Sequence, residues 1–286
     1  MLGGVVDLDG PFRGVEALAE GLVRKHELRS KYVALFPGVY VPRAVSPTFR
    51  HRAQAAWLWS QRGGVLAGLT AARLHGARWV DDTAPIELVW PNSRPPRGIR
   101  VYAETLDEAE IGLRASLPVT TAARTAYDIG RRGTLADAVA RLDALGNATG
   151  LATLDVVDRV RRGARGVRQL TRALALYDAG AQSPRETWLR LMVIDAGFPR
   201  PQTQIPVVVG GRTKYYLDMG WPDLKLAVEY EGDHHRTDRA QFARDIARLD
   251  ELLALGWTII RVAADTPPHA VVRRLRRAWE EASKLR

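Results

Sequence analysis

The chain has 286 residues, a formal net charge of +10 and no cysteine. This length favours two domains, and the lack of cysteine excludes disulfide bonds and thiolate zinc sites. No apolar run approaches the roughly 20 residues that span a membrane, and the first residues have no secretory signal pattern. We therefore expect a cytoplasmic protein without a membrane partner.

Arginine supplies most of the positive charge, and residues 1–182 carry the larger share of the surplus. Because a guanidinium matches phosphate geometry better than an ammonium does, this composition favours a polyanionic partner. A coding bias towards arginine would give the same composition, so charge alone does not establish nucleic-acid binding.

The first part of the chain predicts a mixture of helices and strands. We expect a helix near residues 13–29, a turn at Pro37-Gly38 and a strand from Val39 to Val41. Helix, turn and strand in this order suit a small winged-helix module. Further helices are expected over 68–77, with Thr70 as a plausible N-cap, and from Thr121 onwards.

Residues 134–180 look helical throughout and carry several arginines at helical spacing. A solvated helix face explains these arginines slightly better than an arm that contacts phosphate. The stretch from Gly180 to Pro184 is the best candidate for a boundary between domains. We therefore predict one domain over 1–180 and a second over 183–286.

The second domain has a clear predicted element order. Ser183 caps a helix that starts at Pro184, and Glu186 completes a capping box. Three strands follow, then a long helix near 238–255 that Gly256 closes, a further strand and a basic helix. The order is α-β-β-β-α-β-α, and a helix between the last two strands allows them to be parallel in one mixed sheet.

Acidic residues interrupt the apolar strands of this domain. Asp218 lies in one strand, and Glu229 and Glu231 end the next. Period-2 alternation places the two glutamates on one face, where their charges repel unless a cation lies between them. Mg²⁺ or Mn²⁺ prefers such oxygen ligands, so we predict a metal site at Asp218, Glu229 and Glu231, with Glu186 as a possible fourth group.

A metal held in this way serves phosphodiester hydrolysis. His234 and His235 follow the glutamates closely, and we favour His235 as the acid or base. Taken singly, a carboxylate at a strand end is more often a solvated anchor, and Glu186 is more often a helix cap. The arrangement of Asp followed by Glu-x-Glu on consecutive strands is the part of the pattern that indicates a metal.

The same stretch closely resembles the Vsr-like branch of the PD-(D/E)xK nucleases, over about a third of the chain. That branch has an acid on one strand, a Trp-Pro turn, an acidic strand end, a histidine, an Asp-x-x-Arg helix and a final strand ending in Arg. The matching residues here are Ser183, Glu186, Asp218, Trp221, Pro222, Glu229, Glu231, Gly232, His235, Asp245, Arg248, Gly256, Trp257 and Arg261.

The resemblance implies a restriction-endonuclease-like fold and nuclease activity, with one departure. Glu231 stands where the broader superfamily has a Lys, although relatives in this branch carry an acid there too. The missing positive charge could come from Lys214, Arg236 or Arg248, which we predict to bind nucleic acid, or the two histidines could take its role.

The first domain more loosely resembles the AbiEi-type antitoxin proteins, which begin with a winged helix. The similarity lies in LFPGVYV, LAGLTAARLHGA and LPVTTAARTAYDI. It implies DNA binding in the N-terminal part. His75, in the second of these stretches, is better explained as a packed histidine than as a catalyst.

The sequence thus predicts an α/β protein: an α+β, winged-helix-containing domain followed by a restriction-endonuclease-like αβββαβα core with a mixed sheet. The expected function is Mg²⁺- or Mn²⁺-dependent hydrolysis of DNA, targeted by the N-terminal domain. Two alternatives stay open. One is an antitoxin-like DNA-binding regulator whose nuclease fold has lost catalysis, and the other is a nuclease directed at RNA.

Overall fold

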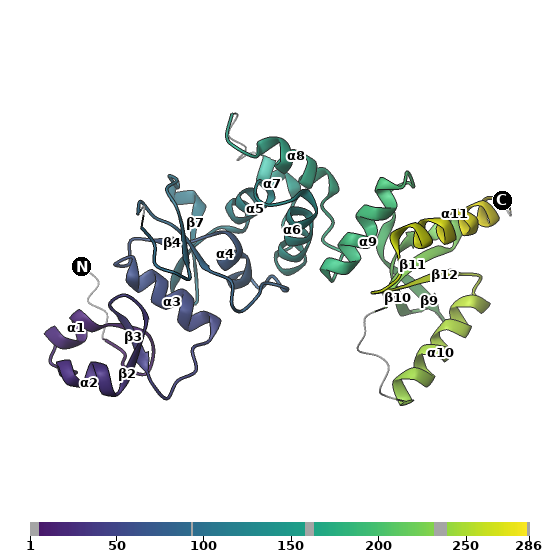
Figure 1. Ribbon diagram of the computed structural model, residues 1–286. Coiled ribbons are helices and arrows are strands. Elements are labelled where there is room, and N and C mark those ends of the chain that lie inside the picture. Colours follow the sequence, from purple (N-terminus) through teal and green to yellow (C-terminus); the bar gives the residue numbers. More distant parts are fainter. Residues whose placement is uncertain (1–5, 93, 158–162, 232–238, 285–286) are drawn as a thin grey trace. The chain divides into compact units, whose positions relative to one another are not determined.

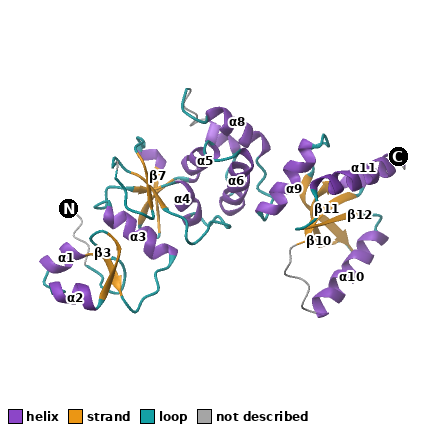
Figure 2. Cartoon of the chain, viewed as in Figure 1, coloured by secondary structure: helices purple, strands orange, loops and turns teal. Residues whose placement is uncertain are grey.

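The computed structural model describes residues 6–92, 94–157, 163–231 and 239–284. Within these ranges the chain is a mixed α/β protein with sheets of three, four and five strands (Figures 1 and 2). It divides into two compact units, and each is described by itself. Unit 1 comprises Met1–Gly133 and Ala148–Thr171, and unit 2 comprises Thr134–Asn147 and Arg172–Arg286.

Unit 1 begins with a small module of short helices and strands. Its elements are β1 (Phe12–Arg13), α1 (Gly14–Ala19), α2 (Lys25–Ser30), β2 (Tyr32–Phe36) and β3 (Val39–Pro42). Strand β3 pairs antiparallel with both β1 and β2. The single helix predicted near 13–29 is wrong, because Gly21 adopts a left-handed φ of 68° and the chain turns between α1 and α2. The predicted strand from Val39 is confirmed.

The rest of unit 1 surrounds a mixed five-stranded sheet with the order β6-β5-β4-β8-β7. Thr121 caps its helix as predicted, but Thr70 lies inside a helix whose N-cap is Ala67. The Thr70 hydroxyl instead accepts the backbone N–H of Glu87. The elements are α3 (Phe49–Trp59), β4 (Val65–Leu66), α4 (Gly68–Leu74), β5 (Ile86–Val89), β6 (Ile99–Tyr102), η1 (Glu108–Glu110), β7 (Ile111–Arg114), β8 (Leu117–Thr120), α5 (Ala122–Gly130) and α7 (Thr153–Val157).

Two further helices contribute residues to both units, namely α6 (Leu135–Thr149) and α8 (Val167–Leu176). Most of α6 belongs to unit 2, although the sequence prediction placed it in the first domain. The reason is a buried ion pair: Asp143 of α6 accepts hydrogen bonds from Arg190 and from the hydroxyl of Thr187, both at 2.7 Å. Side chains that are withdrawn from water in this way hold α6 to the helix that opens the C-terminal core.

Unit 2 has the predicted order of elements after residue 183. They are α9 (Pro184–Asp195), β9 (Gln202–Val209), β10 (Arg212–Trp221), η2 (Pro222–Leu224), β11 (Leu226–Glu231), α10 (Arg239–Ala254), β12 (Thr258–Ala263) and α11 (Pro268–Lys284). The predicted capping box of α9 is confirmed, since Ser183 Oγ accepts the N–H of Glu186 and Glu186 accepts the N–H of Gln182. Gly256 follows α10 with a φ of 84°, as expected for a helix end.

The four strands of unit 2 form one mixed sheet with the order β12-β11-β10-β9. β9, β10 and β11 are antiparallel neighbours, and β11 pairs parallel with β12, as predicted. Helices α9 and α11 cover one face of this sheet, and α10 covers the other (Figure 1). Their apolar side chains pack against the strands in two separate clusters. At Gly220 the strands β10 and β11 lie so close that a Cβ atom would be 2.2 Å from the Leu226 carbonyl oxygen, so only glycine fits there.

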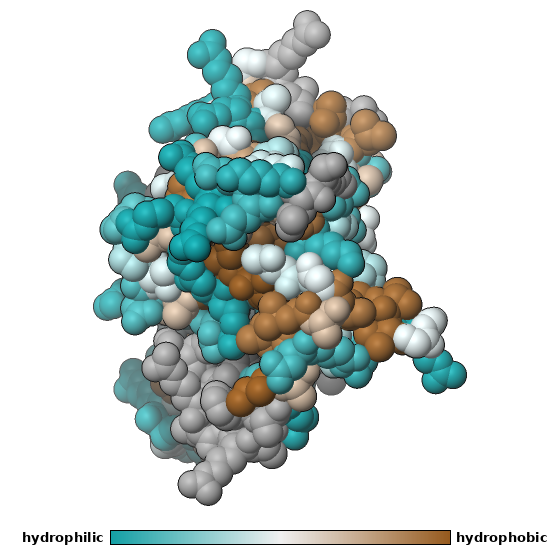
Figure 3. All heavy atoms as spheres, turned by 90° about the vertical axis from the view of Figure 1, so that its right-hand side faces the viewer, coloured by the Kyte–Doolittle hydropathy of each residue, from teal (hydrophilic) through white to brown (hydrophobic). Residues whose placement is uncertain are grey.

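One face of the protein has both hydrophilic and apolar side chains at its surface. Figure 3, viewed from the right-hand side of Figure 1, shows both kinds of side chain. None of the helices in the described ranges combines the length and the apolar character needed to cross a membrane.

Candidate active site

The pairing of β10 with β11 reaches Met219 and Val228, and acidic residues occupy the next positions on both strands. Asp218 follows Met219 towards the N-terminus, and Glu229 follows Val228 towards the C-terminus. There the Asp218 carboxylate accepts the backbone N–H of Tyr230 at 2.9 Å. The Asp218 side chain thus satisfies the backbone N–H of Tyr230, and this hydrogen bond holds the Asp218 carboxyl beside Glu229.

Glu229 forms a two-point ion pair with an arginine of α10. Arg248 Nη1 donates to Glu229 Oε2 at 3.0 Å, and Nη2 donates to Oε1. The Glu229 residue is only 9% exposed, whereas the Arg248 side chain is 30% exposed, so the pair is partly buried. Such planar two-point contacts are the strong form of the arginine–carboxylate pair.

Glu231 has an arginine of its own. Arg261 Nη2, on the neighbouring parallel strand β12, donates to Glu231 Oε1 at 2.6 Å. Asp218, Glu229 and Glu231 line one cavity of about 160 Å³ together with Arg248 and Arg261. The predicted clustering of the three acids on one side is therefore present. Because each glutamate has an arginine, their mutual repulsion does not by itself require a metal ion.

Asp218 differs from the two glutamates. Among the described residues no cationic side chain forms an ion pair with it. The pKa of Asp218 is raised to about 7. Burial is the main cause and the negative charges of Glu186 and Glu229 add to it, while the Tyr230 N–H and Arg248 oppose the shift. A cation that binds near this carboxyl would stabilise its ionised form.

The other predicted site residues lie elsewhere or outside the described residues. Glu186 acts through its charge on Asp218, but its carboxylate is bound within its own capping box and does not line the cavity. Lys214 is not brought to the cavity, since its Nζ pairs with Glu251 of α10 at 2.6 Å. His234, His235 and Arg236 fall outside the described residues.

Arg261 was not among the residues predicted to form the site. Two signals pointed to it: its match to the final strand of the Vsr-like pattern, and its charge in the otherwise apolar strand Thr258–Ala263. Its role depends on the register of β11 with β12, which places Arg261 opposite Glu229 and beside Glu231. That register cannot be predicted from local patterns in the sequence.

The donor chemistry of the cavity fits a hard divalent cation, because its acids offer only oxygen atoms. As they stand, the described residues contain no group of three or more His, Cys, Asp or Glu side chains arranged to hold a metal ion. Glu229 and Glu231 are turned to their arginines instead. Metal binding would therefore require these carboxylates to leave Arg248 and Arg261.

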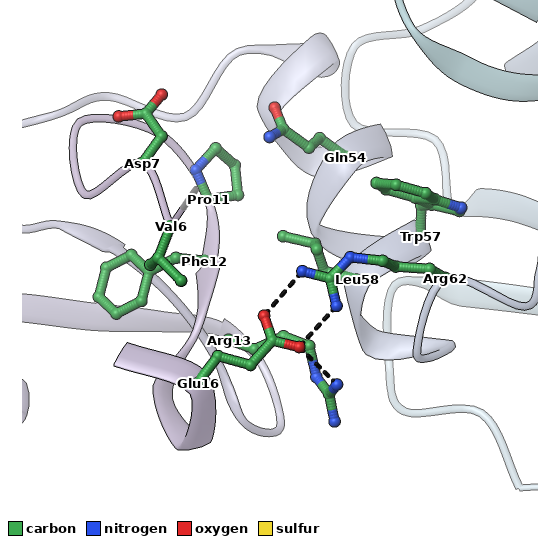
Figure 4. Close-up of a pocket in the computed structure, with 10 residues that line it drawn as sticks. All are labelled: Val6, Asp7, Pro11, Phe12, Arg13, Glu16, Gln54, Trp57, Leu58 and Arg62. Carbon is green, nitrogen blue, oxygen red and sulfur yellow. Dashed lines mark hydrogen bonds and ion pairs between the residues drawn. The ribbon is translucent and has the colours of Figure 1, made fainter. Parts of the chain in front are cut away.

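A larger cavity, of about 490 Å³, lies in unit 1 between the first module and α3. Figure 4 shows Glu16 pointing at the Arg62 guanidinium, with Arg13 beside it. Arg62 donates to both Glu16 oxygens, at 2.5 and 2.7 Å, and Arg13 donates at 2.7 Å. None of the predicted site residues lines this cavity, and its Glu16 carboxylate is already paired by two arginines.

Comparisons with known proteins place the chain among mycobacterial relatives. No family model matches it. It is 31% identical over 237 residues to "Uncharacterized protein MT2308" of Mycobacterium tuberculosis strain CDC 1551, which covers 82% of this chain and 86% of that protein. The same values hold for "Uncharacterized protein Rv2248" of strain H37Rv. A solved structure, the RV2827C protein from Mycobacterium tuberculosis, has a TM-score of 0.40 and 20% identity, over 56% of this chain and 69% of that one. The chain thus belongs to the same family as MT2308 and Rv2248.

Proposed function

We propose that the protein is a metal-dependent nuclease that hydrolyses phosphodiester bonds of DNA in the cavity of unit 2. One observation carries this proposal: three acids from two adjacent strands share a cavity with two arginines. Oxygen ligands for Mg²⁺ or Mn²⁺ and cationic groups for phosphate are then side by side. The element order α-β-β-β-α-β-α and the mixed sheet support it further, because they are what the resemblance to PD-(D/E)xK nucleases implies.

The acids and the arginines of the cavity would have different roles in this reaction. Asp218, Glu229 and Glu231 would hold the metal, which would polarise the phosphoryl oxygens and lower the pKa of a bound water. Once their glutamates ligate the ion, Arg248 and Arg261 are released to bind phosphate oxygens and to stabilise negative charge as it develops. The resemblance adds His235 as an acid or base.

The first module of unit 1 is proposed to be a winged helix that targets the protein to DNA. Two short helices, α1 and α2, precede the β2–β3 hairpin, whereas the sequence predicted one helix before the turn and the strand. Arg24, Lys25 and Arg29, in and just before α2, are exposed. Exposed cations on one short helix suit contacts with phosphate.

A second candidate function is supported by the ion pairs themselves. Each glutamate of the cavity is already neutralised by an arginine, so Glu229 and Glu231 do not require a metal ion. A regulator that grips DNA with a nuclease fold and no longer cleaves it would have such an arrangement. The substitution of Glu231 for the usual Lys is consistent with this candidate.

Cleavage assays on the full chain test the proposal. We expect Mg²⁺- or Mn²⁺-dependent cutting of duplex DNA by the native protein and none by Asp218→Asn with Glu229→Gln. Single-stranded DNA and RNA are the parallel substrates, and preference for RNA would contradict the proposed substrate. We expect Mn²⁺ to raise the thermal stability of the native protein, and the double variant should lose that rise.

Variants of Glu231 separate the two candidate functions. In an active site, both Glu231→Gln and Glu231→Lys should reduce cleavage, because the surrounding groups are arranged around an acid. A native protein that is inactive across metals and substrates, together with an active Glu231→Lys variant, would identify a site that has decayed from the superfamily pattern. That pair of results would favour the regulator.

A further inference from the structure

The C-terminal helix α11 carries a dense group of cations on a firmly anchored support. Val271 and Leu275 are fully buried against the sheet. The four arginines of the segment RRLRR are exposed, namely Arg273, Arg274, Arg276 and Arg277. In Figure 3, which faces this end of unit 2, hydrophilic side chains gather in a band over the upper half of the surface.

One flank of this helix is connected to the candidate active site. Arg274 Nη1 donates to the carbonyl oxygen of Arg261 at 3.0 Å. The side chain of Arg261 in turn holds Glu231 in the cavity. Because successive helical residues are turned by about 100°, Arg277 lies on the same flank as Arg274, and Arg276 lies on the opposite flank. Arg274 and Arg277 therefore extend from the rim of the cavity along α11.

The cavity needs cations of this kind if it is to receive a nucleic acid. An acidic cavity repels a polyanion, and before a metal takes the glutamates Arg248 and Arg261 are paired with them. Within the described part of the chain Arg277 pairs with Glu281 alone. Both side chains are well exposed, so solvent screens that pair and a phosphate can replace it. Arg274 donates one hydrogen bond to a backbone carbonyl oxygen, which does not neutralise its positive charge.

We infer that the Arg274–Arg277 flank of α11 binds the phosphate backbone of the nucleic acid beside the cavity, which places the strand across the acids. This inference rests on the proposed function, since it names the surface that would position the same substrate. The packing of α11 does not explain its arginines, because Val271 and Leu275 anchor the helix and the arginines are exposed. Binding of phosphate would explain them.

The test compares two double variants of the full chain with the same change in charge on the same helix. The first is Arg274→Gln with Arg277→Gln, and the matched control is Arg273→Gln with Arg276→Gln. Affinity for a short DNA duplex is measured in EDTA, so that cleavage plays no part, over a range of salt concentrations. Thermal midpoints of both variants should match that of the native chain, because all four side chains are exposed.

We expect the first variant to bind roughly tenfold more weakly and to lower the slope of log affinity against log salt by about 2, since two phosphate contacts are lost. The control should change much less. Arg274→Lys with Arg277→Lys should restore most of the affinity, because it keeps the charge. An equal or larger loss in the control, or no binding of duplex by the native chain, would overturn the inference.

The outcome is separate from that of the proposed function. If the first variant selectively loses binding and the native protein never cleaves, the proposed phosphate-binding surface on α11 is supported and the proposed nuclease function is contradicted. Metal-dependent cleavage by a native chain whose two double variants bind alike keeps the nuclease and rejects the surface.

Discussion

Unit 1 and unit 2 each contain a cluster of arginines and acids, and the two clusters differ in what remains unpaired. In unit 1, Arg124 donates to Glu110 at 2.9 Å, to Asp128 at 3.1 Å and to Glu104 at 2.7 Å. Arg131 adds further bonds to Glu104 and Asp128. Arg124 and Asp128 are almost completely buried. Every acid of this cluster has an arginine.

The cavity of unit 2 has the same residue types in a more open setting, and Asp218 forms no ion pair with an arginine among the residues that the structure describes. The effect is visible in the pKa values. Although burial raises the pKa of Glu104, Arg131, Arg132 and Arg124 together bring it below the usual value. For Asp218, burial is the main cause that raises the pKa to about 7, and the attraction of Arg248, which forms no ion pair with it, does not offset this rise. A closed cluster of this kind stabilises a fold, whereas an open one with an unpaired acid can receive a ligand.

The largest expected effect comes from opening the closed cluster. Asp128→Ala removes an acid with no exposure and leaves Arg124 and Arg131 buried without it. We expect a loss of about 3–5 kcal/mol of stability, as for other broken buried ion pairs. Denaturant unfolding followed by tryptophan fluorescence measures it. Glu281→Ala, which breaks an exposed pair, is the control and should change stability little. Equal changes in both variants would show that burial does not distinguish the two clusters.

Asp218→Asn should act in the opposite direction. Because the pKa of Asp218 is raised from its unfolded value of about 3.9 to about 7, the folded chain binds the proton more tightly. Its contribution therefore makes the native protein less stable as pH rises from about 4 to about 7. Asparagine keeps the shape and carries no charge. At pH 8 in EDTA we expect the variant to be more stable than the native chain by on the order of 2 kcal/mol, with no difference at pH 4. A variant that is less stable at pH 8 would mean that Asp218 has a cationic partner.

Arg248→Gln tests whether the arginine and a metal compete for Glu229. Removal of a positive charge and of the two-point pair should raise Mn²⁺ affinity severalfold, measured as a larger thermal shift at a given Mn²⁺ concentration. Cleavage should fall at the same time, since the proposed phosphate contact is lost. Arg131→Gln, in the closed cluster, should leave the Mn²⁺ shift unchanged. A fall in Mn²⁺ affinity of the Arg248 variant would show that the arginine orients Glu229 for the metal and does not compete with it.

The smallest effect is expected at Lys214, which the sequence suggested as a site residue. Its ammonium pairs with Glu251, away from the cavity. Lys214→Gln should therefore leave the Mn²⁺ shift unchanged and cleavage within about twofold of the native rate, as expected for an exposed ion pair. A loss of cleavage comparable with that of Arg248→Gln would return Lys214 to the site.

Much of unit 2 follows from local patterns in the sequence. Ser183 with Glu186 defines the start of α9, and Gly256 defines the end of α10. The alternation of Glu229 and Glu231 along β11 places both on the same cavity. These features depend on residues close together in the chain, whose geometry is set by the period of a strand or the ends of a helix.

Features that depend on distant segments were decided only by the tertiary structure. The partner of Glu229 comes from α10, and that of Glu231 comes from the register of β12. Lys214 is drawn to Glu251 by the packing of β10 against α10, and α6 joins unit 2 through Asp143 and Arg190. No periodicity encodes such pairings, because the side chains that meet are separated by whole elements of the chain. The spacing of residues along the strands thus determined that Glu229 and Glu231 lie together. The packing of the sheet and its helices determined which acids form an ion pair with an arginine.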